Sequence, residues 1–160
     1  MVNAVRVERG LRTCYHFRMH VFTYGSLMFA EVWNAVVGRE FGTVAGTAAG
    51  YAIYRVRDAA FPGITPAGIS SSTPGLVYLD VDDASVARLD RFEDTFYDRL
   101  PLKIDCADGV TREANAYVVP HKHAHVLTTD PWTPEWFAAS GGLADFIERF
   151  QGFSRLDGAG

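Results

Sequence analysis

The sequence lacks three features that would place it in a specialised class of protein. Its 160 residues contain no apolar run near the roughly 20 residues of a membrane-spanning helix. Its two cysteines, Cys14 and Cys106, lie far apart and form no C-x-x-C pair, which disfavours a disulfide scaffold and is typical of free thiols in the cytoplasm. Its 15 basic and 19 acidic residues form no long block of one sign, which disfavours a nucleic-acid or membrane surface. We therefore expect a cytoplasmic protein with a small-molecule partner.

The composition predicts one globular domain. The chain is 48% hydrophobic, and 160 residues are enough to bury a substantial core. Residues 1–18 are rich in arginine but have no apolar segment or cleavage site of a secretory signal. We expect residues 1–18 to be an extension that is flexible or loosely docked, and 19–160 to be the folded domain. Because Met19 directly precedes the first strand, translation starting there is a further hypothesis, which intact-mass measurement on native protein would test.

The hydrophobic pattern changes period several times along the chain, which predicts strands with interspersed helices and no repeated unit. The predicted elements, in chain order, are a strand from residue 21, a helix from 29 ending at Gly38, a strand over 43–56 bent at its glycines, a loop over 61–74, a strand over 75–81, a helix over 83–93 capped by Asp82 or Asp83, a hairpin of 96–104 and 112–119, a helix opening at Thr133, and a last helix with Leu143, Phe146, Ile147 and Phe150 on its apolar stripe.

Residues 21–27, with the sequence Val-Phe-Thr-Tyr-Gly-Ser-Leu, are an apolar strand that ends on a Gly-Ser turn directly before a helix. Such a turn directs several backbone N–H groups at one point and is suited to bind a carboxylate or an oxyanion. The side chains of Tyr24 and Ser26 could add hydrogen bonds, although Tyr24 fits equally well as an aromatic residue of the core.

Glu93 lies at the end of the predicted helix over 83–93 and continues its apolar face. It follows Leu89 by four residues and Val86 by seven, which places its carboxylate on the inward side. Partial burial there would raise the pKa of the carboxyl group toward the range of a general base. Periodicity alone favours the alternative, an inert glutamate at a fraying helix end.

Two separate blocks of sequence resemble one known family. Residues 22–28, Phe-Thr-Tyr-Gly-Ser-Leu-Met, resemble the opening signature of the gamma-glutamylcyclotransferase-like family, and Leu-Asp-Arg-Phe-Glu at 89–93, with Tyr97, Asp98, Arg99 and Pro101 after it, resembles its acidic signature. Blocks at 50–54, 61–64 and 75–78 are similar to the segments between them, so the resemblance covers about residues 19–119. Asp94 is a departure, because many members have glycine directly after the glutamate.

The resemblance implies a mixed α+β fold, with a central, mainly antiparallel, barrel-like sheet flanked by helices. It also implies an enzyme of the acyltransferase class that releases 5-oxoproline from a gamma-glutamyl amine or amide by intramolecular attack of the α-amine. No metal or other cofactor is implied. By the same resemblance Glu93 is the general acid and base, and the substrate-binding residues are Tyr24, Gly25, Ser26, Leu27, Tyr97 and Arg99.

Three alternatives remain open at the level of sequence. Arg99 could form an ion pair within the fold, with Asp98 or Glu93, instead of binding a substrate carboxylate. The alternating His121, His123 and His125 could hold a divalent metal if the strand continues past Pro120, but an exposed loop is the favoured interpretation. A non-catalytic module could use the turn at Gly25 to bind a small acidic metabolite. The gamma-glutamyl substrate and the oligomeric state are not determined by the sequence.

Overall fold

The polypeptide is dominated by strands that form one sheet, shown in a computed structural model that describes residues 3–9 and 12–148. In chain order the elements are β1 (Asn3–Arg9), β2 (Arg12–Thr23), the 3-10 turn η1 (Ser26–Met28), α1 (Ala30–Val36), β3 (Thr43–Ala49), β4 (Tyr51–Arg55), β5 (Pro62–Pro66), β6 (Ser72–Asp82), α2 (Asp83–Phe92), β7 (Asp98–Cys106), β8 (Thr111–Val118), η2 (His121–Val126) and α3 (Pro134–Ala139). Residues 142–148 are also helical.

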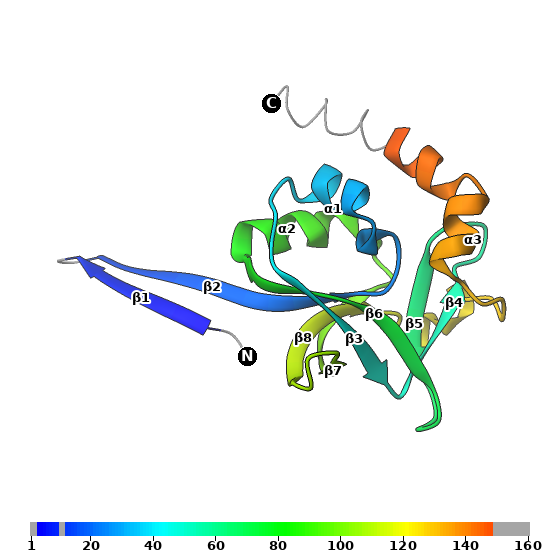
Figure 1. Cartoon of the computed structure of the whole chain (residues 1–160), viewed down its shortest axis with the longest axis horizontal. Coiled ribbons are helices and arrows are strands. Elements are labelled where there is room, and N and C mark those ends of the chain that lie inside the picture. Colours follow the sequence, from blue (N-terminus) through cyan, green and yellow to red (C-terminus); the bar gives the residue numbers. More distant parts are fainter. Residues whose placement is uncertain (1–2, 10–11, 149–160) are drawn as a thin grey trace.

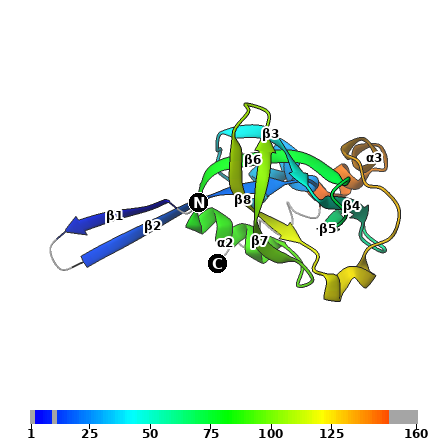
Figure 2. The same ribbon diagram turned by 90° about the horizontal axis from the view of Figure 1, so that it is seen from below.

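The sheet closes on itself. Its strand order is β1-β2-β6-β3-β7-β8-β5-β4, and an additional pairing joins β2 to β8. Strands β2, β6, β3, β7 and β8 therefore form a closed ring, in which every pairing is antiparallel except that of β2 with β8. The short pair β4 and β5 attaches to this ring through a parallel contact of Ile64 with Val118. The predicted α+β fold with a mainly antiparallel, barrel-like sheet is confirmed (Figures 1 and 2).

The first strand and the start of the second form a two-stranded ribbon. Residues Asn3 to Arg9 pair antiparallel with Arg18 to Arg12, and both views show this ribbon extending away from the rest of the molecule (Figures 1 and 2). Strand β2 then continues without a break to Thr23, inside the barrel. The division of the chain at residue 18 stays a prediction, and the described part of the extension is paired strand.

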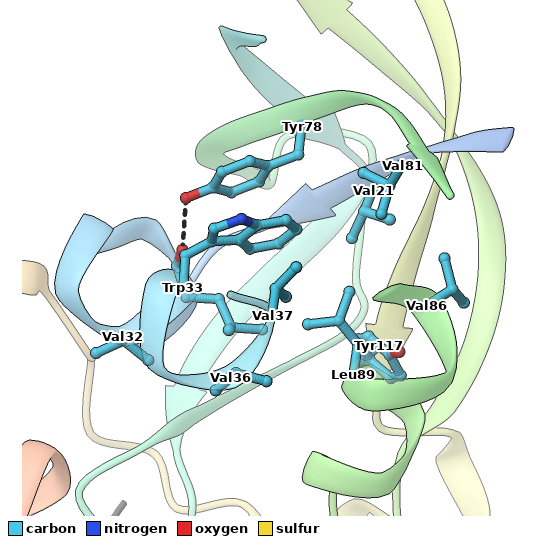
Figure 3. Close-up of a cluster of buried hydrophobic side chains, with 11 residues drawn as sticks. Val21, Val32, Trp33, Val36, Val37, Tyr78, Val81, Val86, Leu89 and Tyr117 are labelled. Carbon is cyan, nitrogen blue, oxygen red and sulfur yellow. Dashed lines mark hydrogen bonds between the residues drawn. The ribbon is translucent and has the colours of Figure 1, made fainter. Parts of the chain in front are cut away.

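Helices α1 and α2 lie next to each other on one side of the barrel, whereas α3 lies beside β4 and β5 (Figure 1). The cluster beneath α1 and α2 is built on Trp33, which stacks on Tyr78 with ring centroids 3.5 Å apart (Figure 3). Val86 and Leu89 contribute the buried face of α2 to the same cluster.

No helix in the described part of the chain has the length and apolar character needed to cross a membrane.

Most of the predicted elements are confirmed. The predicted cap of α2 is Asp82, whose side chain accepts a hydrogen bond from the Ser85 N–H at 2.8 Å. The hairpin is β7 and β8, with Gly109 in the turn at a φ of 83°. The last predicted helix covers residues 142–148, while Phe150 of its predicted stripe lies outside the described residues.

Two predicted elements differ from the structure. The strand predicted over 43–56 is two strands, β3 and β4, because Gly50 has a φ of 85° and turns the chain between them. The loop predicted over 61–74 contains β5 and the start of β6. Its three prolines and its serines indicated a loop, but Pro62 and Pro66 occupy the two ends of β5, and β5 has only a short contact with the ring, where a proline removes few ladder hydrogen bonds.

Candidate active site

A cavity opens where β2 ends, next to the C-terminal end of α2. Its volume is about 110 Å³, while a single water needs only about 10 to 15 Å³, so a ligand of several atoms fits. Aromatic rings make up much of its wall. The lining residues are Phe22, Thr23, Tyr24, Gly25, Ser26, Leu27, Phe61, Pro62, Phe92, Glu93, Asp94, Tyr97, Tyr117 and Phe146.

The turn at Gly25 contributes backbone donors to this cavity. The carbonyl of Gly25 accepts a hydrogen bond from the Met28 N–H at 3.0 Å, and the carbonyl of Ser26 accepts one from the Phe29 N–H at 3.1 Å. Within the described residues, no acceptor receives a hydrogen bond from the N–H groups of Gly25, Ser26 or Leu27. Because all three residues line the cavity, this arrangement suits an anionic oxygen of a ligand.

Packing and hydrogen bonds on both sides fix the turn. A Cβ atom on Gly25 would lie 2.7 Å from Cγ of Pro62, so only glycine lets the turn approach β5 this closely. The Tyr78 hydroxyl donates to the Leu27 carbonyl at 2.9 Å, the bond drawn in Figure 3. The Tyr24 hydroxyl donates to the Tyr117 carbonyl at 2.6 Å. The backbone donors are therefore held in place before any ligand arrives.

Glu93 supplies a carboxyl group to the same cavity. It is the C-cap of α2, where its N–H still donates to the Leu89 carbonyl at 3.0 Å while its backbone turns to an extended conformation. Its side chain is partly buried. Burial, followed by the negative charges of Asp94 and Asp90, raises the pKa of Glu93 from 4.5 to about 8. Glu93 can therefore take up or release a proton near neutral pH.

The tyrosines around Glu93 keep their protons. Burial raises the pKa of Tyr24 well above 10, and the nearby Glu93 adds to the shift. Burial also raises the pKa of Tyr97, whose hydroxyl donates to the Pro62 carbonyl at 2.5 Å. Both hydroxyls thus serve as hydrogen-bond donors that brace the cavity wall, and Glu93 is the lining group with a pKa near neutrality.

The structure brings most of the predicted site residues together. The cavity lining includes Tyr24, Gly25, Ser26, Leu27, Glu93 and Tyr97. Arg99 is not among the lining residues. Its Nε donates to Oδ1 of Asp90 at 2.9 Å, and a second guanidinium nitrogen lies 3.3 Å from the sulfur of Met19. Its ion pair is with Asp90, not with the two carboxylates considered from the sequence. Its contact with substrate stays a prediction.

The three alternating histidines lie elsewhere. Strand β8 ends at Val118, and His121 to Val126 form the 3-10 helix η2. His121 and His125 are exposed, and the rings of His123 and His125 are 6.2 Å apart. In the part of the chain that the structure describes, no group of three histidine, cysteine or acidic residues is placed to hold a metal ion. The strand continuation that a shared histidine face required does not occur.

Comparisons with known proteins show the family to which this chain belongs. The model of the family described as gamma-glutamyl cyclotransferase, AIG2-like, matches residues 21–134. The chain belongs to this family. AIG2-like protein C of Arabidopsis thaliana is 31% identical over 103 residues, which are 64% of this chain and 59% of the relative. AIG2-like protein D of the same plant is 32% identical over 92 residues, 57% of this chain and 60% of that one. The chain thus spans about three fifths of the length of these relatives.

Solved structures share the fold of this family member. A protein from Arabidopsis thaliana, solved in solution, superposes with a TM-score of 0.64 at 22% identity, covering 88% of this chain and 84% of that one. A structure titled gamma-glutamyl cyclotransferase superposes with a TM-score of 0.57 at 13% identity, covering 84% and 86%. At these identities the likeness establishes the common architecture.

Sequence reasoning missed several cavity residues of this family member. Tyr117 is the most informative of them, because its hydroxyl donates to Oδ1 of Asp90 at 2.7 Å while its carbonyl accepts from Tyr24. In the sequence it is one aromatic residue in a predicted strand. The approach of α2 to β8 and the pairing of β2 with β8 give it these partners, so no local pattern could reveal them. Pro62 lies in the block 61–64 that resembles the family, but the sequence assigned it no role of its own.

Proposed function

We propose that this protein releases 5-oxoproline from a gamma-glutamyl amine or amide, with Glu93 as general acid and base. The main support for this proposal is that Glu93 and the Gly25 turn line one cavity, in a chain of the gamma-glutamyl cyclotransferase family. The carboxyl group has its pKa near 8, and the turn offers backbone N–H groups without an acceptor among the described residues. Proton transfer and anion binding are the two tasks of this reaction.

The reaction needs no nucleophile from the protein. The α-amine of the glutamyl group attacks its own γ-carbonyl, a C–N bond closes the five-membered ring, and the original amide C–N bond breaks. Between the α-ammonium group and the ring N–H the attacking nitrogen loses two protons, one before and one after attack, and the leaving nitrogen gains two and departs as an ammonium group. Glu93 as a carboxylate accepts these protons in turn and, as a carboxylic acid, returns them to the leaving nitrogen. Atoms and charge balance, and no external reactant is consumed. The cavity contributes by holding the flexible glutamyl chain in a folded, near-attack conformation.

The raised pKa of Glu93 is matched to this task. The α-ammonium group of a substrate titrates near pH 8, and the pKa of Glu93 is also about 8. A transfer between two groups of similar pKa is close to thermoneutral, which suits one carboxyl group that must both accept and donate. A carboxyl group at its ordinary pKa of 4.5 would be a weak base toward the ammonium group.

The backbone amides of Gly25, Ser26 and Leu27 are proposed to bind the oxyanion that forms on the γ-carbonyl, or the α-carboxylate of the glutamyl group. The rigid turn supports this role, because fixed donors stabilise a developing charge without reorganising. Tyr97 is proposed to brace the wall beside the glutamyl group through its bond to Pro62. Arg99 is left outside the proposed set of substrate contacts, since it is absent from the lining.

The test is to incubate the protein with a panel of gamma-glutamyl amino acids, peptides and amines, and to measure 5-oxoproline by mass spectrometry. We expect release from at least one member, accompanied by an equal amount of free amine. If no member is turned over while 5-oxoproline or glutamate raises the melting temperature, the protein is a binding module that uses the same turn. Turnover that yields glutamate instead of 5-oxoproline would exclude cyclisation.

A further inference from the structure

One carboxylate oxygen outside the cavity joins three elements of the fold. Oδ1 of Asp90, on α2, accepts a hydrogen bond from the Tyr117 hydroxyl on β8 at 2.7 Å. The same oxygen accepts one from Nε of Arg99 on β7 at 2.9 Å. Both bonds involve a charged partner, and such bonds are shorter and stronger than neutral ones.

The sheet register explains how two strands reach the same oxygen. Arg99 and Tyr117 are direct partners in the β7–β8 ladder, so their side chains project from the same face of the sheet. Asp90 lies three residues before Glu93, which caps the end of α2. The shared bond therefore fixes the last turn of the helix against the barrel, close to the residue that supplies the carboxyl group of the cavity.

We call the hydrogen bonds that Arg99 and Tyr117 donate to Asp90 the clamp. Tyr117 also connects this clamp to the anion-binding turn. Its carbonyl accepts the hydroxyl of Tyr24 at 2.6 Å, and Tyr24 directly precedes Gly25. Tyr117 is 6% exposed, so its hydrogen bonds are protected from water over most of its surface. One residue of β8 thus has hydrogen-bond partners both directly before the Gly25 turn and in the last turn of α2, although neither signature of the sequence contains it.

Resting on the proposed function, we propose that Asp90, Arg99 and Tyr117 are positioning residues that hold Glu93 in its working place opposite the Gly25 turn. Arg99 acts only through Asp90 in this arrangement and does not contact the substrate. Tyr117 sets the distance between the two halves of the site.

The effect of the clamp can be measured through the pKa of Glu93, because charged groups surround this carboxyl group. The carboxylates of Asp90 and Asp94 disfavour ionisation of Glu93. The phenols of Tyr24, Tyr97 and Tyr117 also face it electrostatically. Arg99 offsets the charge of Asp90 through their ion pair. Removing Asp90 should therefore ease the ionisation of Glu93, and removing Arg99 should hinder it.

The experiment follows the titration of the Glu93 carboxyl carbon by NMR in the full chain, together with the pH profile of 5-oxoproline release. We expect Asp90→Asn to lower the apparent pKa of Glu93 and Arg99→Gln to raise it, each by about half a pH unit or more. Arg99→Lys keeps the charge and should keep the wild-type pKa. Arg112→Gln is the matched control, since it breaks an ion pair with Asp108 at the hairpin turn and should leave the titration unchanged.

Tyr117→Phe completes the test, because it removes one hydroxyl and keeps the ring. We expect kcat to fall about tenfold with little change in KM, since a displaced carboxyl group affects proton transfer more than binding. Unchanged Glu93 titration in both Asp90→Asn and Arg99→Gln, or shifts in the same direction, would overturn the clamp. Opposite shifts in a protein that releases no 5-oxoproline would support the clamp and refute the proposed function, so the two failures are distinguishable.

Discussion

The Gly25 turn and the end of α2, which both line the cavity, are built in different ways. The Gly25 turn offers backbone N–H groups and is held by close packing, with Pro62 occupying the space that a side chain on Gly25 would need. The end of α2 offers a titratable side chain, Glu93, and is held by the hydrogen bonds of Asp90. One side depends on shape and the other on charge.

This difference separates the expected effects of mutation. A change in the turn displaces fixed donors and should weaken binding of the glutamyl group, whatever the pH. A change near Glu93 alters a protonation equilibrium and should appear in kcat and in the pH profile. The two halves of the site can therefore be tested independently, although both line the same cavity.

The largest effect is expected for the charged side. Glu93→Gln keeps the shape of the side chain but cannot exchange a proton, so we expect the rate of 5-oxoproline release to fall by about 10³-fold. Circular dichroism should show an intact fold. Glu40→Gln, an exposed glutamate outside the cavity lining, is the control and should retain full activity. A Glu93→Gln variant of wild-type activity would remove Glu93 from the mechanism.

The turn is tested by Gly25→Ala. The added Cβ would lie 2.7 Å from Cγ of Pro62, so the turn or β5 must shift, and we expect kcat/KM to fall by roughly 10-fold to 100-fold, mainly through KM. Gly68→Ala is the matched control, because its Cβ would meet only Oγ of Ser70 at 4.0 Å. Equal kinetics for the two alanine variants would show that the position of the turn is unimportant.

The stability of the protein should reveal the raised pKa of Glu93 without any substrate. Glu93 holds its proton up to about pH 8 in the folded state and to about 4.5 in the unfolded state. The favourable contribution of protonated Glu93 to the free energy of unfolding is therefore complete below about pH 4.5 and is lost as the pH rises through 8. We expect Glu93→Gln to increase the free energy of unfolding by about 1 to 3 kcal/mol at pH 8, and by much less at pH 5.

Urea denaturation at the two pH values measures this difference, with Glu40→Gln as the control that should show none. A Glu93→Gln variant with the same gain at pH 5 and pH 8 would mean that the carboxyl group titrates normally.

The smallest expected effect concerns Asp94, the residue directly after Glu93. Asp94 is exposed and lines the cavity, and its charge raises the pKa of Glu93. Asp94→Asn should therefore move the acidic limb of the rate profile to lower pH, by about half a unit. Asp108→Asn, at the distant hairpin turn, should leave the limb in place. A limb that moves to higher pH in Asp94→Asn would contradict the assigned electrostatics.

The sequence predicted those parts of the site that depend on local pattern. Glu93 continues the face of Val86 and Leu89, and the structure places it at the end of that helix and in the cavity lining. The Gly25 turn follows from a strand that ends before a helix. The partner of Arg99 could not be predicted, because it depends on how α2 crosses the β7–β8 pair. For the same reason the hydrogen bonds of Tyr117 could not be predicted. Strand β5 was not predicted because the prolines at its ends indicated a loop.

We propose that the Gly25 turn and Glu93, which line the same cavity, bind one ligand between them. Amide and carboxyl NMR spectra recorded while 5-oxoproline is added test it most directly. We expect the largest amide shifts at Gly25, Ser26 and Leu27, with a change in the titration of Glu93 at the same ligand concentration. Shifts confined to another region, such as His121 to Val126, with an unchanged Glu93 would contradict the account.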